Sequence, residues 1–158
     1  MTKCLIFDLD GTLIKLPIRY ETLQNNLKNF FHIEDNLSPL IPSIIEQAKN
    51  NQNIIDEAFN IVCDEELIAV ETLEEIEGLH DVIEHVISKN YTISLVTMQC
   101  KRSLDIILKK LNLGKKFSTV LTRDDYPDRF LQIKKTSEML NLNPSDITMI
   151  GDRIHDIN

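Results

Sequence analysis

The chain has 158 residues, of which 42% are hydrophobic and 27% charged, and its formal net charge is −8. This composition is typical of one globular domain with its own core, and the negative charge argues against a general nucleic-acid or anionic-membrane surface. No stretch approaches the ~20 apolar residues of a membrane span, and the short N-terminal apolar run ends in an aspartate, unlike a signal peptide. We therefore expect a cytoplasmic protein with no nucleic-acid or membrane partner.

The first predicted strand, over residues 3–7, leads directly into the sequence Asp-Leu-Asp-Gly-Thr. Residues i and i+2 of a strand share a face, so Asp8 and Asp10 should project together from its carboxyl end, where open α/β sheets bind ligands. Adjacent carboxylates repel unless a cation lies beside them. The pair therefore indicates a Mg²⁺ site in which one carboxylate attacks an electrophile and the other moves protons. A polar turn is the alternative interpretation, but Gly11 and Thr12 favour a site because they suit a tight, hydrogen-bonded loop.

A block of helices is predicted between this strand and the rest of the chain, over residues 13–78, where no good strand pattern occurs. Helical spacing of apolar residues and a Ser-Pro helix start predict helices over residues 16–31 and 38–50, and one or two more over residues 53–77. The acidic runs Asp64-Glu65-Glu66 and Glu74-Glu75 are interpreted as a solvated face. This block is interpreted as a cap inserted into the core.

Helices and strands alternate from residue 79 onward. Apolar stripes predict helices over residues 79–87 and 104–111, and a third is expected over 128–142 with Phe130, Ile133 and Leu140 facing inward. Strands are predicted over residues 91–97, 117–121 and 147–150. The alternation implies a parallel sheet with right-handed crossovers, that is, a Rossmann-like α/β core made of residues 1–12 and 79–158.

Polar residues follow three of these strands. Asp8 and Asp10 follow the first, Thr97 ends the second, and Asp152 and Asp156 lie in a Gly-Asp-x-x-x-Asp sequence after the fourth. Because the carboxyl ends of parallel strands lie along one edge, these side chains are predicted to share a pocket.

In these motifs the chain resembles the haloacid dehalogenase superfamily of phosphatases. The sequence Asp-Leu-Asp-Gly-Thr from Asp8 matches the first motif of that family, the apolar run into Thr97 matches the second, and the sequence from Gly151 to Asp156 matches the fourth. The helical insertion fits the family's α-helical cap class, as in relatives that resemble phosphoglycolate phosphatase.

The resemblance implies a two-step phosphoryl transfer. Asp8 would attack phosphorus to form an aspartyl-phosphate, and Asp10 would protonate the leaving oxygen and then deprotonate the hydrolytic water. Mg²⁺ would be held by the Asp8 carboxylate, the Asp10 backbone carbonyl and Asp152, with Asp156 as a further ligand or support. Thr97 would bind a phosphoryl oxygen. An acid at Asp10 favours phosphoryl transfer over carbon–halogen cleavage.

Two departures from the family pattern bear on the site. The lysine of the family's third motif would fall near Pro127-Asp128, where none is present, so Arg129 and Lys134 are competing candidates for the phosphate-binding cation. The family pattern also continues with a helix and a strand beyond the fourth motif, whereas the chain stops at Asn158. We therefore expect the C-terminal layer to be missing and the fourth strand to lie at a sheet edge.

The combined interpretation is a Mg²⁺-dependent phosphatase that hydrolyses a small phosphorylated metabolite. A phosphomutase of the phosphoglucomutase type, which uses the same motifs, is the alternative within the enzymes. A catalytically silent, truncated relative is the alternative outside them, favoured by the displaced third motif. The sequence predicts neither the substrate nor an oligomeric state.

Overall fold

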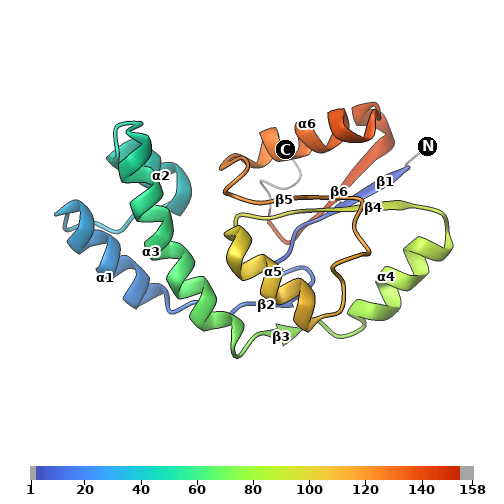
Figure 1. Cartoon of the computed structure of the whole chain (residues 1–158), viewed down its shortest axis with the longest axis horizontal. Coiled ribbons are helices and arrows are strands. Elements are labelled where there is room, and N and C mark those ends of the chain that lie inside the picture. Colours follow the sequence, from blue (N-terminus) through green and yellow to red (C-terminus); the bar gives the residue numbers. More distant parts are fainter. Residues whose placement is uncertain (1–2, 154–158) are drawn as a thin grey trace. The chain divides into compact units, whose positions relative to one another are not determined.

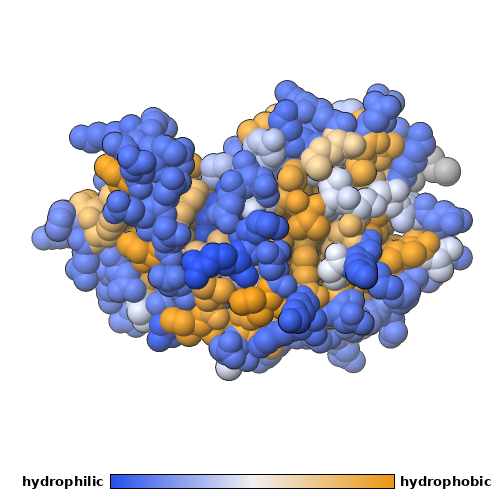
Figure 2. All heavy atoms as spheres, viewed as in Figure 1, coloured by the Kyte–Doolittle hydropathy of each residue, from blue (hydrophilic) through white to orange (hydrophobic). Residues whose placement is uncertain are grey.

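The computed structural model describes residues 3–153 of the chain, which divides into two compact units. Within the described residues, one unit comprises residues 3–16 and 73–153, and the other comprises residues 17–72. On the face shown in Figure 2, hydrophilic residues cover most of the surface, with hydrophobic residues in smaller areas between them. No helix in the described part is both long enough and apolar enough to cross a membrane.

The larger unit is built on a parallel sheet, as the sequence predicts. Its strands are β1 (Cys4–Phe7), β4 (Thr92–Val96), β5 (Thr119–Leu121) and β6 (Ile147–Ile150), in the order β5-β4-β1-β6. Because β1 pairs in parallel with both β4 and β6, its carboxyl end lies between theirs. Within the described residues, β6 is at the edge of the sheet.

Helices cover both faces of this sheet. They are α4 (Leu79–Ser88), α5 (Lys101–Lys110) and α6 (Arg129–Leu140), and a short 3₁₀ helix, η1 (Pro144–Asp146), precedes β6. Figure 1 shows α6 on one face of the sheet and α4 and α5 on the other. A buried core of Cys4, Ile6, Val96 and Leu121 packs with partly buried residues from the β5–α6 segment and β6, namely Tyr126, Ile133, Leu140, Leu142, Ile147 and Met149.

The prediction that Phe130 faces inward is wrong. Its side chain is 72% exposed, whereas the buried residues of α6 are Gln132, Thr136 and Ser137. Each of these polar side chains has a backbone carbonyl partner: Gln132 donates to Thr97, just after β4, and Thr136 and Ser137 donate to Gln132 and Leu142.

A second, two-stranded sheet was not predicted from the sequence. Strands β2 (Ile14–Lys15) and β3 (Glu74–Glu75) pair antiparallel and belong to the larger unit. Two-residue strands are too short to give an alternating pattern, so the insertion predicted over residues 13–78 included both of them. The smaller unit accordingly begins at residue 17 and ends at residue 72.

The smaller unit consists of three helices, α1 (Tyr20–Phe31), α2 (Leu40–Gln47) and α3 (Gln52–Val70). Their apolar faces form one core, and its buried members are Leu23, Leu27, Leu37, Ile41, Ile44, Ala58 and Val62. The side chain of Asn51 caps α3 by accepting a hydrogen bond from the Asn53 N–H at 3.1 Å.

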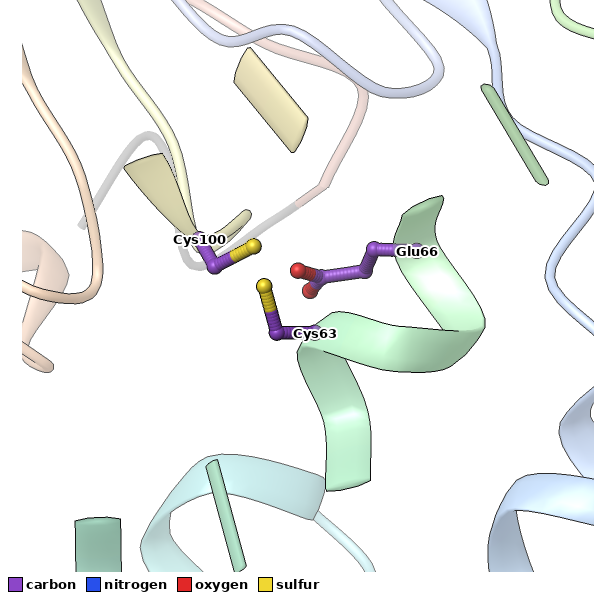
Figure 3. Close-up of side chains that lie close together, drawn as sticks. All are labelled: Cys63, Glu66 and Cys100. Carbon is purple, nitrogen blue, oxygen red and sulfur yellow. The ribbon is translucent and has the colours of Figure 1, made fainter. Parts of the chain in front are cut away.

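The interpretation of the first acidic run as a solvated face is wrong for two of its three residues. Glu65 and Glu66 are 4% and 3% exposed. Glu65 accepts two hydrogen bonds from the Arg19 guanidinium, at 2.9 and 3.0 Å, which compensates its burial. Figure 3 shows that Glu66 and Cys63 project from α3 one turn apart. The same figure labels Cys100, the N-cap residue of α5, whose Sγ accepts from the Ser103 N–H at 3.4 Å.

Candidate active site

The turn after β1 fixes the two aspartates of the first motif. The Asp8 N–H donates to the Ile150 carbonyl at 2.9 Å, which extends the ladder between β1 and β6 by one bond. The chain then turns tightly around the Leu9 carbonyl, which accepts from the N–H groups of the three residues 12–14. Gly11 has φ +84°, a conformation that glycine adopts without strain.

Asp8 is buried and ion-paired. It is 5% exposed, and its Oδ1 lies 2.7 Å from Nη2 of Arg129, the first residue of α6. Nη1 of Arg129 donates to the Val96 carbonyl at 2.8 Å, at the end of β4. The guanidinium is therefore held between two strand ends, with its charge against the Asp8 carboxyl.

Asp10 lies in a different electrostatic environment. Its Oδ1 accepts a hydrogen bond from the Leu16 N–H at 2.9 Å. Burial raises the pKa of Asp10 above its ordinary value, the charge of Asp152 adds to that effect, and Leu16 and the Arg153 charge oppose it. The two carboxyls of this motif thus have different surroundings: Asp8 is paired with a cation, whereas burial favours the protonated form of Asp10.

Asp152 lies against the turn after β1. A Cβ atom added to Gly11 would be 2.2 Å from Oδ2 of Asp152, so this carboxylate would have to move to admit a side chain there. Asp152 itself is exposed. Asp156 lies outside the described residues.

Thr97 is 1% exposed and directly follows β4. Its N–H donates to the Leu121 carbonyl at 3.0 Å, and its Oγ1 accepts from the Gln99 N–H at 3.1 Å. The register of β1 and β4 pairs Phe7 with Leu95, which brings the residues after the two strands to the same edge.

Of the two candidate cations, only Arg129 contacts the first motif. Lys134 is exposed on α6, and within the described residues it makes no hydrogen bond or ion pair. Its charge instead helps to lower the pKa of Glu138, behind the effect of Lys135. Arg129 is the first residue of α6, whereas Lys134 lies on an exposed face of that helix.

The oxygen donors at this edge fit a hard divalent cation. Carboxylate and backbone carbonyl oxygens are the ligands that Mg²⁺ prefers, and Asp8, Asp10 and Asp152 supply them here. Burial is the main cause of the raised pKa of Asp10, and the nearby negative charge of Asp152 adds to it. A cation bound here would relieve this repulsion.

Sequence reasoning missed two buried side chains next to the site. Gln132 is 0% and Arg123 is 1% exposed, and both donate to carbonyls of the turn after β4. One signal for Gln132 was present, because it lies three residues after Arg129 and so shares its helix face. Hydrophobic periodicity cannot detect such a polar inward face.

Comparison with known proteins gives one consistent result. A family model described as haloacid dehalogenase-like hydrolase matches residues 5–158. The pyrophosphatase PpaX of Bacillus mycoides (strain KBAB4) is 28% identical over 170 residues, covering 96% of this chain and 75% of the relative.

Solved structures show the same fold. A predicted phosphatase from Clostridium acetobutylicum superposes with a TM-score of 0.71 at 21% identity, over 99% of this chain and 79% of that one. A predicted phosphoglycolate phosphatase from Haemophilus somnus 129PT gives a TM-score of 0.65 at 19% identity, over 96% and 77%.

Proposed function

The chain belongs to the haloacid dehalogenase-like hydrolase family, and from this premise we propose that it is a Mg²⁺-dependent phosphatase of a small phosphorylated metabolite. The single observation that carries the proposal is the 2.7 Å ion pair between Arg129 and Asp8. It sets a cation beside a buried carboxyl group at the carboxyl edge of the sheet. A phosphoryl group that approaches this edge meets a nucleophile and the charge needed to stabilise it.

Asp8 is the proposed nucleophile. One carboxylate oxygen attacks phosphorus, the bond from phosphorus to the leaving oxygen breaks, and an aspartyl-phosphate forms. Arg129 stays near the transferred group because its other nitrogen is bound to the Val96 carbonyl. Its guanidinium then offsets the negative charge that gathers on the phosphoryl oxygens.

Asp10 is the proposed acid and base. Its raised pKa suits a carboxyl that gives a proton to the leaving oxygen. The resulting carboxylate then takes a proton from the water that attacks the aspartyl-phosphate, which releases phosphate and restores Asp8. The hydrogen bond from the Leu16 N–H holds Asp10 in place through both steps.

Asp8, the backbone carbonyl of Asp10 and Asp152 are the residues proposed to hold Mg²⁺. Asp156 is proposed to add a ligand or support from outside the described residues. When bound, the ion would supply positive charge that neutralises the phosphoryl oxygens. Thr97 is proposed to donate its hydroxyl to a phosphoryl oxygen. Lys134 remains a weaker candidate than Arg129, because only Arg129 contacts Asp8.

The substrate is proposed to be a small metabolite phosphate. The similar proteins support this class. One relative is named a pyrophosphatase, and two solved structures with the same fold are named a predicted phosphatase and a predicted phosphoglycolate phosphatase. The helices of residues 17–72 are proposed to act as a cap that excludes water and selects the leaving group. A location in the cytoplasm stays a prediction of the sequence.

The first test is hydrolysis of p-nitrophenyl phosphate with Mg²⁺ and with EDTA, by the wild type and by Asp8→Asn. We expect turnover only with Mg²⁺, and a loss of about 10³-fold or more in the variant, since the nucleophile is removed. Asp105→Asn, an exposed aspartate on α5, is the matched control and should be fully active. Full activity of Asp8→Asn would overturn the proposal.

A metabolite panel then defines the reaction. The panel contains sugar phosphates, phosphoglycolate and pyrophosphate, and inorganic phosphate is measured against the organic product. Stoichiometric release of phosphate supports a hydrolase. Recovery of the phosphoryl group on a sugar would instead support a phosphomutase.

A further inference from the structure

Four consecutive carbonyl groups, starting with the last residue of β4, are bound by donors from one later segment of the chain. The carbonyls of residues 96, 97, 98 and 99 accept, in order, from Arg129 Nη1, Gln132 Nε2, Arg123 Nη1 and the Arg123 N–H. All of these donors lie within residues 123–132, in the loop after β5 and the first turn of α6. The turn that carries Thr97 is therefore shaped by side chains far from it in sequence.

Gln132 is the least expected of these donors. Its side chain is fully buried, and Nε2 donates at 2.9 Å both to the Thr97 carbonyl and to the Tyr126 carbonyl. The two acceptors fix the orientation of the amide, because the opposite orientation would place Oε1 against two carbonyl oxygens. One side chain thus connects the turn after β4 to the segment that leads into α6.

We propose that Gln132 is a positioning residue that holds the turn after β4 in the conformation in which Thr97 can contact the phosphoryl group of the substrate. This inference rests on the function proposed above. Gln132 does not itself touch the reacting atoms. It acts by binding the Thr97 carbonyl, while Arg129, one turn earlier on the same face of α6, binds Asp8.

Loss of this bond should affect the transition state more than substrate binding. The Thr97 hydroxyl accepts a hydrogen bond from the Gln99 N–H, which ties the side chain to the backbone of the same turn. If the Thr97 carbonyl lost its partner and the peptide rotated, the hydroxyl would therefore move with it. A displacement of about 1 Å at a phosphoryl contact can cost about 10²-fold in rate. Contacts of this kind strengthen as charge develops on the phosphoryl oxygens, so kcat should fall more than KM rises.

The test compares two near-isosteric variants with one control. Gln132→Met removes both donors, and Gln132→Glu replaces them with an acceptor that faces two carbonyl oxygens. Thr136→Val is the control, because Thr136 is equally buried one turn later and, among residues 3–153, its hydroxyl bonds only to the Gln132 backbone carbonyl. Far-ultraviolet circular dichroism and thermal melting establish which variants are folded.

Steady-state kinetics with p-nitrophenyl phosphate and Mg²⁺ give the first readout. We expect kcat to fall roughly 10- to 100-fold in Gln132→Met, and further in Gln132→Glu, with KM changed less than about threefold. Thr136→Val should stay within about twofold of the wild type. A folded Gln132→Met variant with wild-type kcat would overturn the proposal, as would an equal loss in Thr136→Val.

Nuclear magnetic resonance gives a second readout that does not depend on activity. In the wild type, the Nε2 protons of Gln132 should exchange slowly with solvent, a measurement that needs no variant. In Gln132→Met, the amide resonances of Met98 and Gln99 should shift, and in Thr136→Val they should not. If the wild type were inactive but Gln132→Met still showed these shifts, the proposed function would be rejected and the positioning role of Gln132 retained. Unshifted resonances, or fast exchange of the Nε2 protons, would reject the positioning role.

Discussion

Arg129 makes two contacts in different directions, and this explains why arginine rather than lysine suits the position. Nη2 donates a hydrogen bond to Asp8 and Nη1 donates one to the Val96 carbonyl. A lysine has one nitrogen and cannot bind both acceptors in the same fixed geometry. We expect Arg129→Lys to lower kcat/KM by roughly 10-fold and Arg129→Met by roughly 100-fold or more. Lys134→Met is the control and should change kcat/KM by less than about twofold. Loss of activity in Lys134→Met with an active Arg129→Met would reverse the assignment.

We predict that the Asp10 carboxylate lowers the stability of the folded protein, although it is needed for the proposed acid–base step. Because burial raises its pKa, the folded state binds more protons than the unfolded state, and the protein loses stability as pH rises through that range. Asparagine cannot ionise and keeps an oxygen for the Leu16 N–H. In EDTA at neutral pH, we expect Asp10→Asn to be more stable by about 0.5–1 kcal/mol and to be inactive.

Denaturant unfolding over a range of pH checks this prediction. The advantage of Asp10→Asn should shrink as pH falls and should vanish below about pH 4, where the carboxyl is protonated in both states. An advantage that is independent of pH, or a variant less stable than the wild type at neutral pH, would contradict it.

Two separable features disfavour a side chain at Gly11, namely its backbone conformation and the closeness of the Asp152 carboxylate. Gly11→Ala should destabilise the protein by about 1–2 kcal/mol because φ is +84°, with a smaller further cost for moving the exposed Asp152 carboxylate that the new Cβ would meet. Gly78 has φ +79° but open space around it, so Gly78→Ala should cost only about 1–2 kcal/mol. Equal effects in urea unfolding would show that the contact with Asp152 does not matter.

At the scale of elements, α3 carries a buried carboxylate that stabilises the smaller unit through an ion pair within it. Glu65 is buried and binds Arg19, the N-cap residue of α1, through two bonds. We expect Glu65→Gln to destabilise the chain by about 0.5–1.5 kcal/mol, a modest value because the Arg19 side chain is half exposed. Glu57→Gln, on an exposed position of the same helix, should stay within about 0.5 kcal/mol. Thermal melting of both variants measures the difference.

Element type was predictable from the sequence where apolar residues recur regularly, and side-chain direction was not predictable where polar residues face inward. The four strands of the main sheet follow from apolar runs that end in turn residues. On α6 the same reasoning placed Phe130 inside, although Gln132 occupies that face. Glu65 was missed on α3 for the same reason. Each of these buried polar groups depends on a partner more than ten residues away, and a local pattern carries no information about it.

At the scale of the whole molecule, the sheet order collects motifs that are distant in the chain. The order β5-β4-β1-β6 puts the end of β1 between those of β4 and β6, so Asp8, Thr97 and Asp152 follow adjacent strands. The alternation of helices and strands predicted this gathering of strand ends. It could not choose between Arg129 and Lys134, because that choice depends on the angle at which α6 meets the sheet.

The central claim is that Asp8 carries the phosphoryl group during turnover. Acyl phosphates are reduced by borohydride, so quenching the enzyme with borohydride during hydrolysis of p-nitrophenyl phosphate should convert Asp8 to homoserine. Mass spectrometry of the N-terminal peptide locates the product, and enzyme quenched without substrate is the control. We predict homoserine at position 8 only when substrate and Mg²⁺ are both present. Steady turnover with Asp8 unmodified, or with the reduced residue elsewhere in the chain, would contradict the account.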